Sequence, residues 1–577
     1  MAVKFTPEQQ QAIDLHDCNI LVSAAAGSGK TAVLSERIVK MVCREENPVD
    51  IDRLLVVTFT KAAAAEMRER ISQAILKRLN EDGGNEHLQR QAAIIHNAQI
   101  TTIDSFCLFV LRNNFEDIGL DPAFRIADEG EVELLSQDVM KEMLEEHFAS
   151  GEEQFFHTIE YFCPNGRESV LESHILQLYR YALSYPFPEK WLRERKKDYV
   201  YETMEDIAAS DAGVFLFGHL QKLLAGVAEE LKRAESICEE PDGPYMYGEV
   251  LEQEREAIEK IARAENLVRL SELLPAFTPG KFPGKKDDSV SAEKREQVKN
   301  LHDKIKNMVK KMQTSYFNLP FETVFRQAKT AAEAVESLVD LSLEFMERLK
   351  AKKTDKKLLD FSDMEHYALQ ILVEEDEEGN MVPTKTALEY RDYFEEVLID
   401  EYQDSNLVQE YLLKAVAREE DGKKNRFMVG DVKQSIYKFR LARPELFLEK
   451  YDTYSLTDGE NRKIDLHKNF RSRNEVIDTV NDVFSKIMQK ELGGIVYDEE
   501  AALYAGAVYP ENPGCESELL LIEKPEKEAE LDARQTEALL IAAKIKELLA
   551  GFQVTDKETG ALRPVRYKDI VVLLRTN

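Results

Sequence analysis

The sequence predicts an α/β fold with parallel sheets, interrupted by a large and mostly helical insertion. Short apolar runs bounded by turn residues alternate with helical patterns, which is typical of strands joined by crossover helices. This alternation occurs in two blocks, and about 240 residues of mostly helical pattern lie between them. A glycine-rich loop after the first apolar run is a third observation, because such loops join a strand to a helix.

The two blocks cover about residues 1–115 and 358–460, and each contributes strands to the predicted sheet. A helix is expected over Lys61–Leu79, because this segment is rich in alanine and the glycines Gly83 and Gly84 follow it. The apolar runs predict strands at Asn19–Ser23, Leu54–Phe59, Val397–Asp400 and Phe427–Gly430.

The predicted insertion, residues 116–357, contains two segments of biased charge. Asp128–Glu153 holds ten carboxylates and a single base, whereas Lys281–Lys311 holds ten Lys or Arg and five Asp or Glu. Both fit solvated helix faces, and the second also fits an arm that contacts phosphates. These two interpretations of the basic segment stay open.

A third section is expected at residues 461–577, with strands at Leu519–Ile522 and Ile570–Leu574 and a helix over about Leu531–Leu549. The sequence stops directly after the last predicted strand, at Arg575-Thr576-Asn577. This ending suggests a truncated polypeptide.

Composition narrows the class of protein. The chain has 577 residues, and 76 Lys and Arg against 108 Asp and Glu give a formal net charge of −32. This balance argues against a polybasic protein that coats nucleic acid, because cations that neutralise phosphates supply most of that affinity. No apolar run approaches the ~20 residues that span a bilayer, and the six cysteines form no CxxC pair. We therefore expect a cytoplasmic protein without membrane contact, in which any DNA site is a local groove.

The glycine-rich loop predicts a phosphate site. It follows an apolar strand and opens a helix expected over Thr31–Val42, so its backbone N–H groups can surround a polyphosphate. Lys30 would meet the β- and γ-phosphates of ATP, and Thr31 would hold Mg²⁺. By itself the pattern also fits an ordinary glycine-rich turn. The loop residues are Ala24, Ala25, Ala26, Gly27, Ser28, Gly29, Lys30 and Thr31.

Two acidic residues and a polar sensor complete the expected ATP site. Asp400 and Glu401 end an apolar strand, where a magnesium ligand and a base for the attacking water are needed. Gln434 follows the next strand and would report loss of the γ-phosphate. The aromatic side chains of Tyr437 and Phe439 come soon after, and they fit either base stacking on a single strand or core packing.

Together these motifs resemble those of UvrD/Rep-like superfamily 1 helicases, in the same order along the chain. Two further segments, residues 124–129 and 497–504, look like the AddA family of helicase-nuclease subunits, which act in bacterial double-strand-break repair. The matching helicase segments are residues 5–9, 24–31, 58–67, 102–107, 400–405, 430–440 and 469–472.

The resemblance implies a role for each matching residue and a division into domains. Gln9 would read adenine, Phe470 would stack on it, and Arg471 would contact the γ-phosphate. The implied contacts to single-stranded DNA are Phe59, Thr60, Ser105, Tyr437 and Phe439, whereas Lys61 stands where the family usually has Asn. The implied parts are two RecA-like motor domains and an insertion. Domain 1A covers 1–115 and 358–460, the insertion 1B covers 116–357, and domain 2A covers 461–577 and is incomplete. Residues 1–475 approximate the UvrD-like ATP-binding region.

The resemblance also implies 3′ to 5′ movement on DNA, an AddB-like second subunit in a heterodimer, and further motifs and a nuclease domain after residue 577.

Three hypotheses for the function follow. The first is an ATP-driven DNA motor, and the second is a catalytically incomplete module that binds DNA or a partner with a vestigial ATP site. A metabolic or signalling P-loop NTPase is third, and it is disfavoured by the 370 residues between Lys30 and Asp400.

Overall fold

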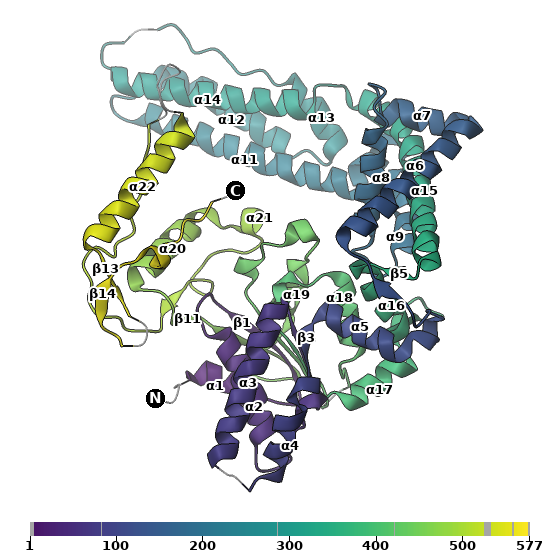
Figure 1. The fold of residues 1–577 in the computed structure, drawn as a ribbon. Helices are drawn as coiled ribbons and strands as arrows, with labels where there is room; N and C mark the ends of the chain where they lie inside the picture. Colours follow the sequence, from purple (N-terminus) through teal and green to yellow (C-terminus); the bar gives the residue numbers. More distant parts are fainter. Residues whose placement is uncertain are drawn as a thin grey trace. The chain divides into compact units, whose positions relative to one another are not determined.

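The computed structural model divides the chain into two compact units, which are drawn in Figure 1. One unit is made of Met1–Phe124 and Phe361–Asn577, and the other is Arg125–Asp360. Within the described residues, no helix is both long and apolar enough to cross a membrane. The structure describes residues 5–81, 84–285, 287–420, 422–523, 532–556 and 559–574.

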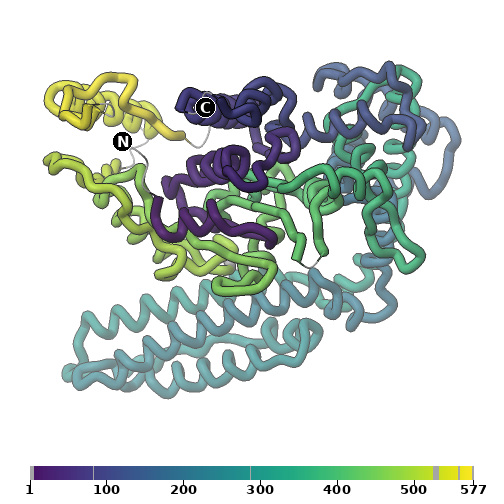
Figure 2. Tube along the Cα trace, turned by 90° about the horizontal axis from the view of Figure 1, so that it is seen from below, coloured from purple at the N-terminus to yellow at the C-terminus, as the bar shows by residue number. Residues whose placement is uncertain are grey.

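The predicted α/β class is confirmed, because a six-stranded parallel sheet lies at the centre of the first unit. Its order is β10-β1-β9-β8-β2-β3, so β1 lies between β10 and β9, and β2 lies between β8 and β3. Figure 2 shows the beginning of the chain and residues near 400–470 running beside each other. The strands are β1 (Asn19–Ala24), β2 (Leu54–Thr58), β3 (Gln99–Thr102), β8 (Glu396–Ile399), β9 (Arg426–Gly430) and β10 (Asn461–Leu466).

Helices cover both faces of this sheet (Figure 1). Alternate apolar side chains of β1, such as Ile20 and Val22, belong to the core on one of these faces. On one face, Ile20 and Val22 of β1 and Val56 of β2 pack against Leu34 and Ile38. Burying each such side chain contributes about 2 kcal/mol. The helices on this face are α1 (Pro7–Asp14), α2 (Lys30–Cys43), α3 (Lys61–Glu81) and α4 (Glu86–Ile94).

The helices of the opposite face come from both blocks, and α19 packs against β1 and the segments that follow β8 and β9. A short hairpin, β6 (Val373–Glu375) with β7 (Met381–Pro383), connects two of these helices. The helices are α5 (Ile103–Asn114), α16 (Phe361–Leu372), α17 (Lys385–Tyr393), α18 (Leu407–Ala415) and α19 (Pro444–Thr453).

The strand β10 lies at an expected domain boundary. Residue 461 is the predicted first residue of motor domain 2A, and Asn461–Leu466 forms β10, which pairs with β1 in the first sheet. The remaining elements of this unit are β11 (Lys468–Asn469), α20 (Asn474–Ile487), α21 (Lys490–Gly493), β12 (Tyr504–Ala505), α22 (Ala533–Gly551), β13 (Gln553–Thr555) and β14 (Leu562–Pro564).

Two strands predicted in this section are wrong. Residues 519–522 and 570–574 form no strand, and Leu519 is 82% and Leu573 89% exposed. An apolar run becomes a strand only when a neighbour satisfies its backbone, and no strand of the described residues pairs with either run. The helix expected from Leu531 is α22, whereas Leu531, Gly83 and the final residues 575–577 lie outside the described residues.

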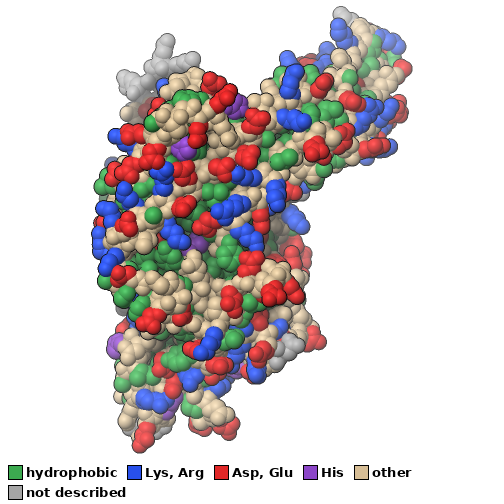
Figure 3. All heavy atoms as spheres, turned by 90° about the vertical axis from the view of Figure 1, so that its right-hand side faces the viewer, with side chains coloured by type: hydrophobic (Ala, Val, Ile, Leu, Met, Phe, Trp, Pro, Cys, Tyr) green, Lys and Arg blue, Asp and Glu red, His purple; other side chains and the backbone are tan. Residues whose placement is uncertain are grey.

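The second unit is helical, and its described residues form three hydrophobic clusters. Its bounds are 125–360, and the insertion was expected at 116–357. Its ends are joined by the parallel strands β4 (Arg125–Ile126) and β5 (Leu358–Leu359). Figure 3 draws one face of the whole molecule, and acidic and basic side chains are interspersed on it. The helices are α6 (Glu129–Ser150), α7 (Glu153–Phe162), α8 (Ser169–Ala182), α9 (Pro188–Arg195), α10 (Met204–Ala209), α11 (Asp211–Glu239), α12 (Gly248–Ala262), α13 (Leu267–Ala276), α14 (Ala292–Tyr316) and α15 (Phe321–Asp355).

Candidate active site

The carboxyl ends of neighbouring parallel strands meet at one edge of the sheet, and the predicted site residues lie there. The glycine-rich loop follows β1, Asp400 and Glu401 follow β8, and Asp431 follows β9. These three strands are adjacent in the sheet. In open parallel sheets, ligands bind in the crevice outside this edge.

The loop joins β1 to α2 in the geometry that a phosphate site requires. Ala24 is the last residue of β1, and Lys30 is the first residue of α2. Gly27 and Gly29 have φ values of 71° and 84°, a left-handed conformation that favours glycine. The first N–H groups of α2 lack partners within the helix, so they and the positive end of its dipole favour an anion. The Ser28 hydroxyl is buried and has no hydrogen-bond partner among the described residues.

Lys30 and Glu401 face each other across this crevice. The Lys30 Nζ donates to the Glu401 Oε2 at 2.9 Å, which joins the phosphate loop to the acidic end of β8. Glu401 has a φ of 51°, which is uncommon for a residue other than glycine and is often found at functional sites. The predicted lysine and general base are therefore brought together.

Asp400 is a partly buried carboxyl at the end of β8. Burial and the neighbouring charge of Glu401 raise the pKa of Asp400 to about 6, against an opposing effect of Lys30. Its Oδ1 accepts the backbone N–H of Glu401 at 3.1 Å. A carboxylate with this desolvation cost suits a divalent cation, and the hydroxyl of Thr31 adds a second oxygen of the type that Mg²⁺ prefers. The residues present thus fit a magnesium ion.

Three further polar residues in this crevice had no assigned role in the sequence prediction. Gln403 donates to Glu401 and to Asp404 at 3.0 and 3.1 Å, and it accepts the backbone N–H of Asp431 at 3.0 Å. Burial and the charge of Glu401 raise the pKa of Asp404 to about 6. The carboxylate of Asp431 accepts the side-chain amide of Gln434 at 2.8 Å, so the predicted sensor is held through Asp431. The sequence signals that pointed to this region are the two matching segments, residues 400–405 and 430–440, which contain all three residues.

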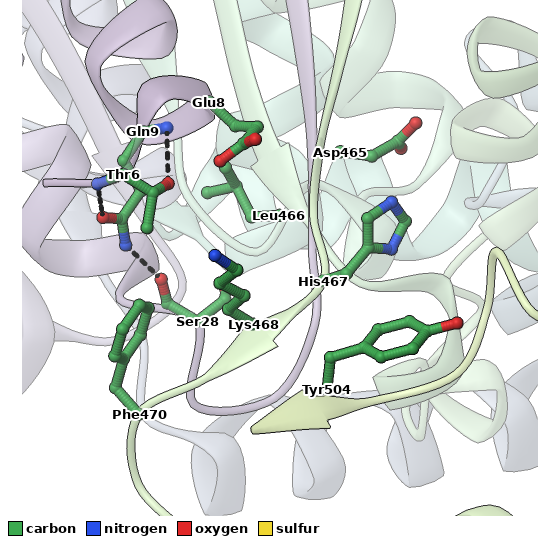
Figure 4. Close-up of a pocket in the computed structure, with 10 residues that line it drawn as sticks. All are labelled: Thr6, Glu8, Gln9, Ser28, Asp465, Leu466, His467, Lys468, Phe470 and Tyr504. Carbon is green, nitrogen blue, oxygen red and sulfur yellow. Dashed lines mark hydrogen bonds between the residues drawn. The ribbon is translucent and has the colours of Figure 1, made fainter. Parts of the chain in front are cut away.

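A cavity of about 290 Å³ lies beside the phosphate loop, and its lining includes Gln9, Ser28 and Phe470 (Figure 4). The Gln9 side-chain amide donates to the Ser28 carbonyl at 2.8 Å, and a capping box with Thr6 fixes Gln9 at the start of α1. Phe470 lies at the wall opposite α1 in Figure 4, and Lys468 lies between them. The two predicted adenine contacts therefore line the same cavity.

The segment that carries Phe470 and Arg471 is attached to the phosphate loop through Asn469, a residue without a predicted role. The Asn469 side chain donates to the Ala26 carbonyl at 2.8 Å, and the Phe470 N–H donates to the Gly27 carbonyl at 2.8 Å. A Cβ at Gly27 would lie 2.9 Å from the Cβ of Arg471, so glycine permits this approach. The Arg471 side chain is exposed.

The predicted DNA contacts follow strands of the same sheet. The rings of Phe59, after β2, and Tyr437, after β9, have centroids 4.6 Å apart. Phe439 is 75% exposed and lies 5.9 Å from Tyr437, so these rings do not form a closed core. The other two contacts have local roles: the Thr60 hydroxyl accepts the Ala63 N–H in the first turn of α3, and Ser105 bonds to Thr102.

A phosphate loop, an acid-tipped strand and a parallel sheet define a P-loop nucleoside triphosphatase. The chain belongs to the UvrD/REP helicase family, because the model of the UvrD/REP helicase N-terminal domain matches residues 5–455.

Curated relatives agree with this family. The chain is 44% identical to an ATP-dependent helicase/nuclease subunit of Lachnoclostridium phytofermentans, over 99% of this chain and 44% of that protein. Proteins of the same name in Clostridium perfringens and Bacillus pumilus are 42% and 41% identical, over 100% and 99% of this chain and 48% and 47% of theirs. The chain thus spans about half the length of the curated relatives it matches.

Proposed function

We propose that the chain supplies the ATP-driven motor of a cytoplasmic 3′ to 5′ DNA helicase, and that it belongs to the AddA component of a helicase-nuclease in double-strand-break repair. The names of its relatives, which describe ATP-dependent helicase/nuclease subunits, support this proposal. An AddB-like protein would be the second component of the heterodimer, and single- and double-stranded DNA would be the substrates.

Binding of ATP begins at residues that already surround the cavity. Gln9 and Phe470 hold the adenine, and the backbone N–H groups of residues 27–31 surround the phosphates. Lys30 leaves Glu401 for the phosphate oxygens, because a polyphosphate offers it more negative charge than one carboxylate does. The same movement frees the Glu401 carboxylate.

Hydrolysis uses the freed carboxylate. Glu401 orients a water and accepts its proton as the water attacks the γ-phosphorus, while Arg471 and Lys30 compensate charge on the phosphoryl oxygens. A magnesium ion held by Thr31 and Asp400 would neutralise phosphate charge when bound. Gln434 then senses the loss of the γ-phosphate.

Single-stranded DNA is proposed to run along Phe59, Thr60, Ser105, Tyr437 and Phe439. Aromatic faces stack on any base, so this surface suits movement that does not depend on sequence. The single observation that carries the proposal is that the Lys30–Glu401 pair and the Phe59–Tyr437 pair lie at the same edge of one parallel sheet.

The test is ATP turnover with and without single-stranded DNA in the full-length protein. Lys30→Ala and Glu401→Gln are expected to abolish DNA-stimulated turnover, with Glu401→Gln retaining ATP binding. The matched control is Lys352→Ala with Glu142→Gln, an ion pair of 3.0 Å on the surface of the helical unit. Unchanged turnover in the first two variants would refute the assignment.

The competing hypothesis of a catalytically incomplete module is separated by the same assay. Such a module would bind DNA and show no turnover above background in any variant. A metabolic triphosphatase would hydrolyse ATP at a rate that DNA does not change.

A further inference from the structure

Gln403 is buried between the two halves of the site, and it is 1% exposed. Its amide nitrogen donates to Glu401 Oε2 and Asp404 Oδ2, and its amide oxygen accepts the N–H of Asp431. The backbone N–H can only donate, so the orientation of the amide is determined. One side chain therefore joins the end of β8 to the end of β9.

Gly430 permits this contact. A Cβ added at Gly430 would overlap the Gln403 Oε1 and approach the ring of Phe447 at 3.1 Å. Any larger residue would push the end of β9 away from Gln403. The close approach of these two strand ends is thus specified by a glycine and a glutamine together.

The connection continues from Asp431 toward the aromatic surface, which is formed by Phe59, Tyr437 and Phe439. Asp431 is buried, and its carboxylate holds Gln434 at 2.8 Å and the Lys433 ammonium at 3.0 Å. Three residues after Gln434, Tyr437 packs on Phe59. A continuous series of hydrogen bonds therefore runs from Glu401 to the segment that carries Tyr437.

Glu401 Oε2 accepts hydrogen bonds from both Lys30 and Gln403. When Lys30 moves to the phosphates, Gln403 keeps its bond to this oxygen. We propose that Gln403 is the positioning residue that holds Glu401 during hydrolysis. Through Asp431, it also couples the position of Glu401 to that of the segment that carries Tyr437. This inference rests on the function proposed above, and it adds a specific side chain that couples ATP to the DNA surface.

Two substitutions separate the halves of this connection. Gln403→Glu keeps an oxygen for the Asp431 N–H but loses the donor to Glu401, whereas Gln403→Met loses both. Loss of a hydrogen bond to a charged group corresponds to about a ten- to hundred-fold effect, so both variants should lose that much DNA-stimulated turnover. Protonation of the carboxyl introduced by Gln403→Glu restores a donor. As the pH is lowered from about 8 to about 6, turnover relative to the parent at the same pH should therefore recover in Gln403→Glu and not in Gln403→Met.

The matched control is Gln91, which makes the same kinds of bonds away from the site. It is 0% exposed, accepts the Ile51 N–H at 2.8 Å and donates to Asp50 at 2.7 Å. Gln91→Glu and Gln91→Met should lower stability without changing the ratio of DNA-stimulated to basal turnover or its pH profile.

The measurements are ATP turnover in the full-length protein and hydrogen exchange of residues 430–437 with and without an ATP analogue. In the parent, the analogue should change exchange in this segment, and in Gln403→Met it should not. Gln403 variants that match the Gln91 variants in both measurements would overturn the inference. A parent without DNA-stimulated turnover would instead refute the proposed function.

Discussion

Replacement of Asp400 by Asn is expected to stabilise the protein in the absence of nucleotide and magnesium. Burial and Glu401 raise the pKa of Asp400 to about 6, so its charged form is disfavoured in the folded state. A carboxyl whose pKa rises from about 4 to about 6 on folding costs about 3 kcal/mol once it is charged. Asn keeps an oxygen that can accept the Glu401 N–H and removes the charge.

The pH dependence has a definite sign. Below about pH 4 Asp400 is protonated in both states, so the substitution changes little. As the pH rises toward 6 the unfolded chain releases the proton before the folded protein does, and stability is lost. Asp400→Asn should therefore raise the free energy of unfolding by about 3 kcal/mol near pH 8 and by roughly half of that near pH 5.

Urea unfolding followed by circular dichroism, with a chelator present, measures this gain. Asp376→Asn is the control, because N–H donors such as that of Asn380 lower the pKa of Asp376, and no gain is expected there. Addition of ATP and magnesium should make the parent more stable than Asp400→Asn, because only the parent retains the carboxylate for the metal. An Asp400→Asn gain that is absent at pH 8, or equal at both pH values, would contradict the assigned cost of this charge.

Two other substitutions test the fold and the DNA surface. Arg37→Met should destabilise the protein by about 3–5 kcal/mol, because it leaves Glu396 buried without the charge of Arg37. Thermal unfolding measures this change, and a loss below about 1 kcal/mol would contradict the prediction. Tyr437→Ala should weaken single-strand binding by about 1–3 kcal/mol in fluorescence anisotropy and leave ATP binding unchanged, because Tyr437 packs on Phe59 and not in the base cavity; equal losses of both ligands would show that Tyr437 supports the whole site.

The phosphate loop and the acidic strand end could be predicted because their chemistry is local. Residues 24–31 carry the glycines that the turn requires, and Asp400 and Glu401 directly follow the apolar residues of β8. Parallel strands then bring these segments to one edge, whatever their separation in the chain.

Contacts that depend on tertiary approach could not be predicted. Gln403 and Asn469 act through hydrogen bonds to Asp431 and Ala26, which are near only after the sheet has formed. The apolar runs at 519–522 and 570–574 had the composition of strands, but a strand also needs a partner for its backbone. Likewise the sequence places residues 461–466 at the start of a later section, because parallel pairing with β1 leaves no trace in their own side chains.

The nucleotide site and the aromatic surface are expected to act as one unit at the edge of the sheet. The decisive measurement is the affinity of the full-length protein for a single-stranded oligonucleotide without nucleotide, with ADP and with a non-hydrolysable ATP analogue. We predict affinities that differ among these states and, by linkage, an equal effect of DNA on analogue binding. Identical affinities in all three states would show that the two surfaces are independent.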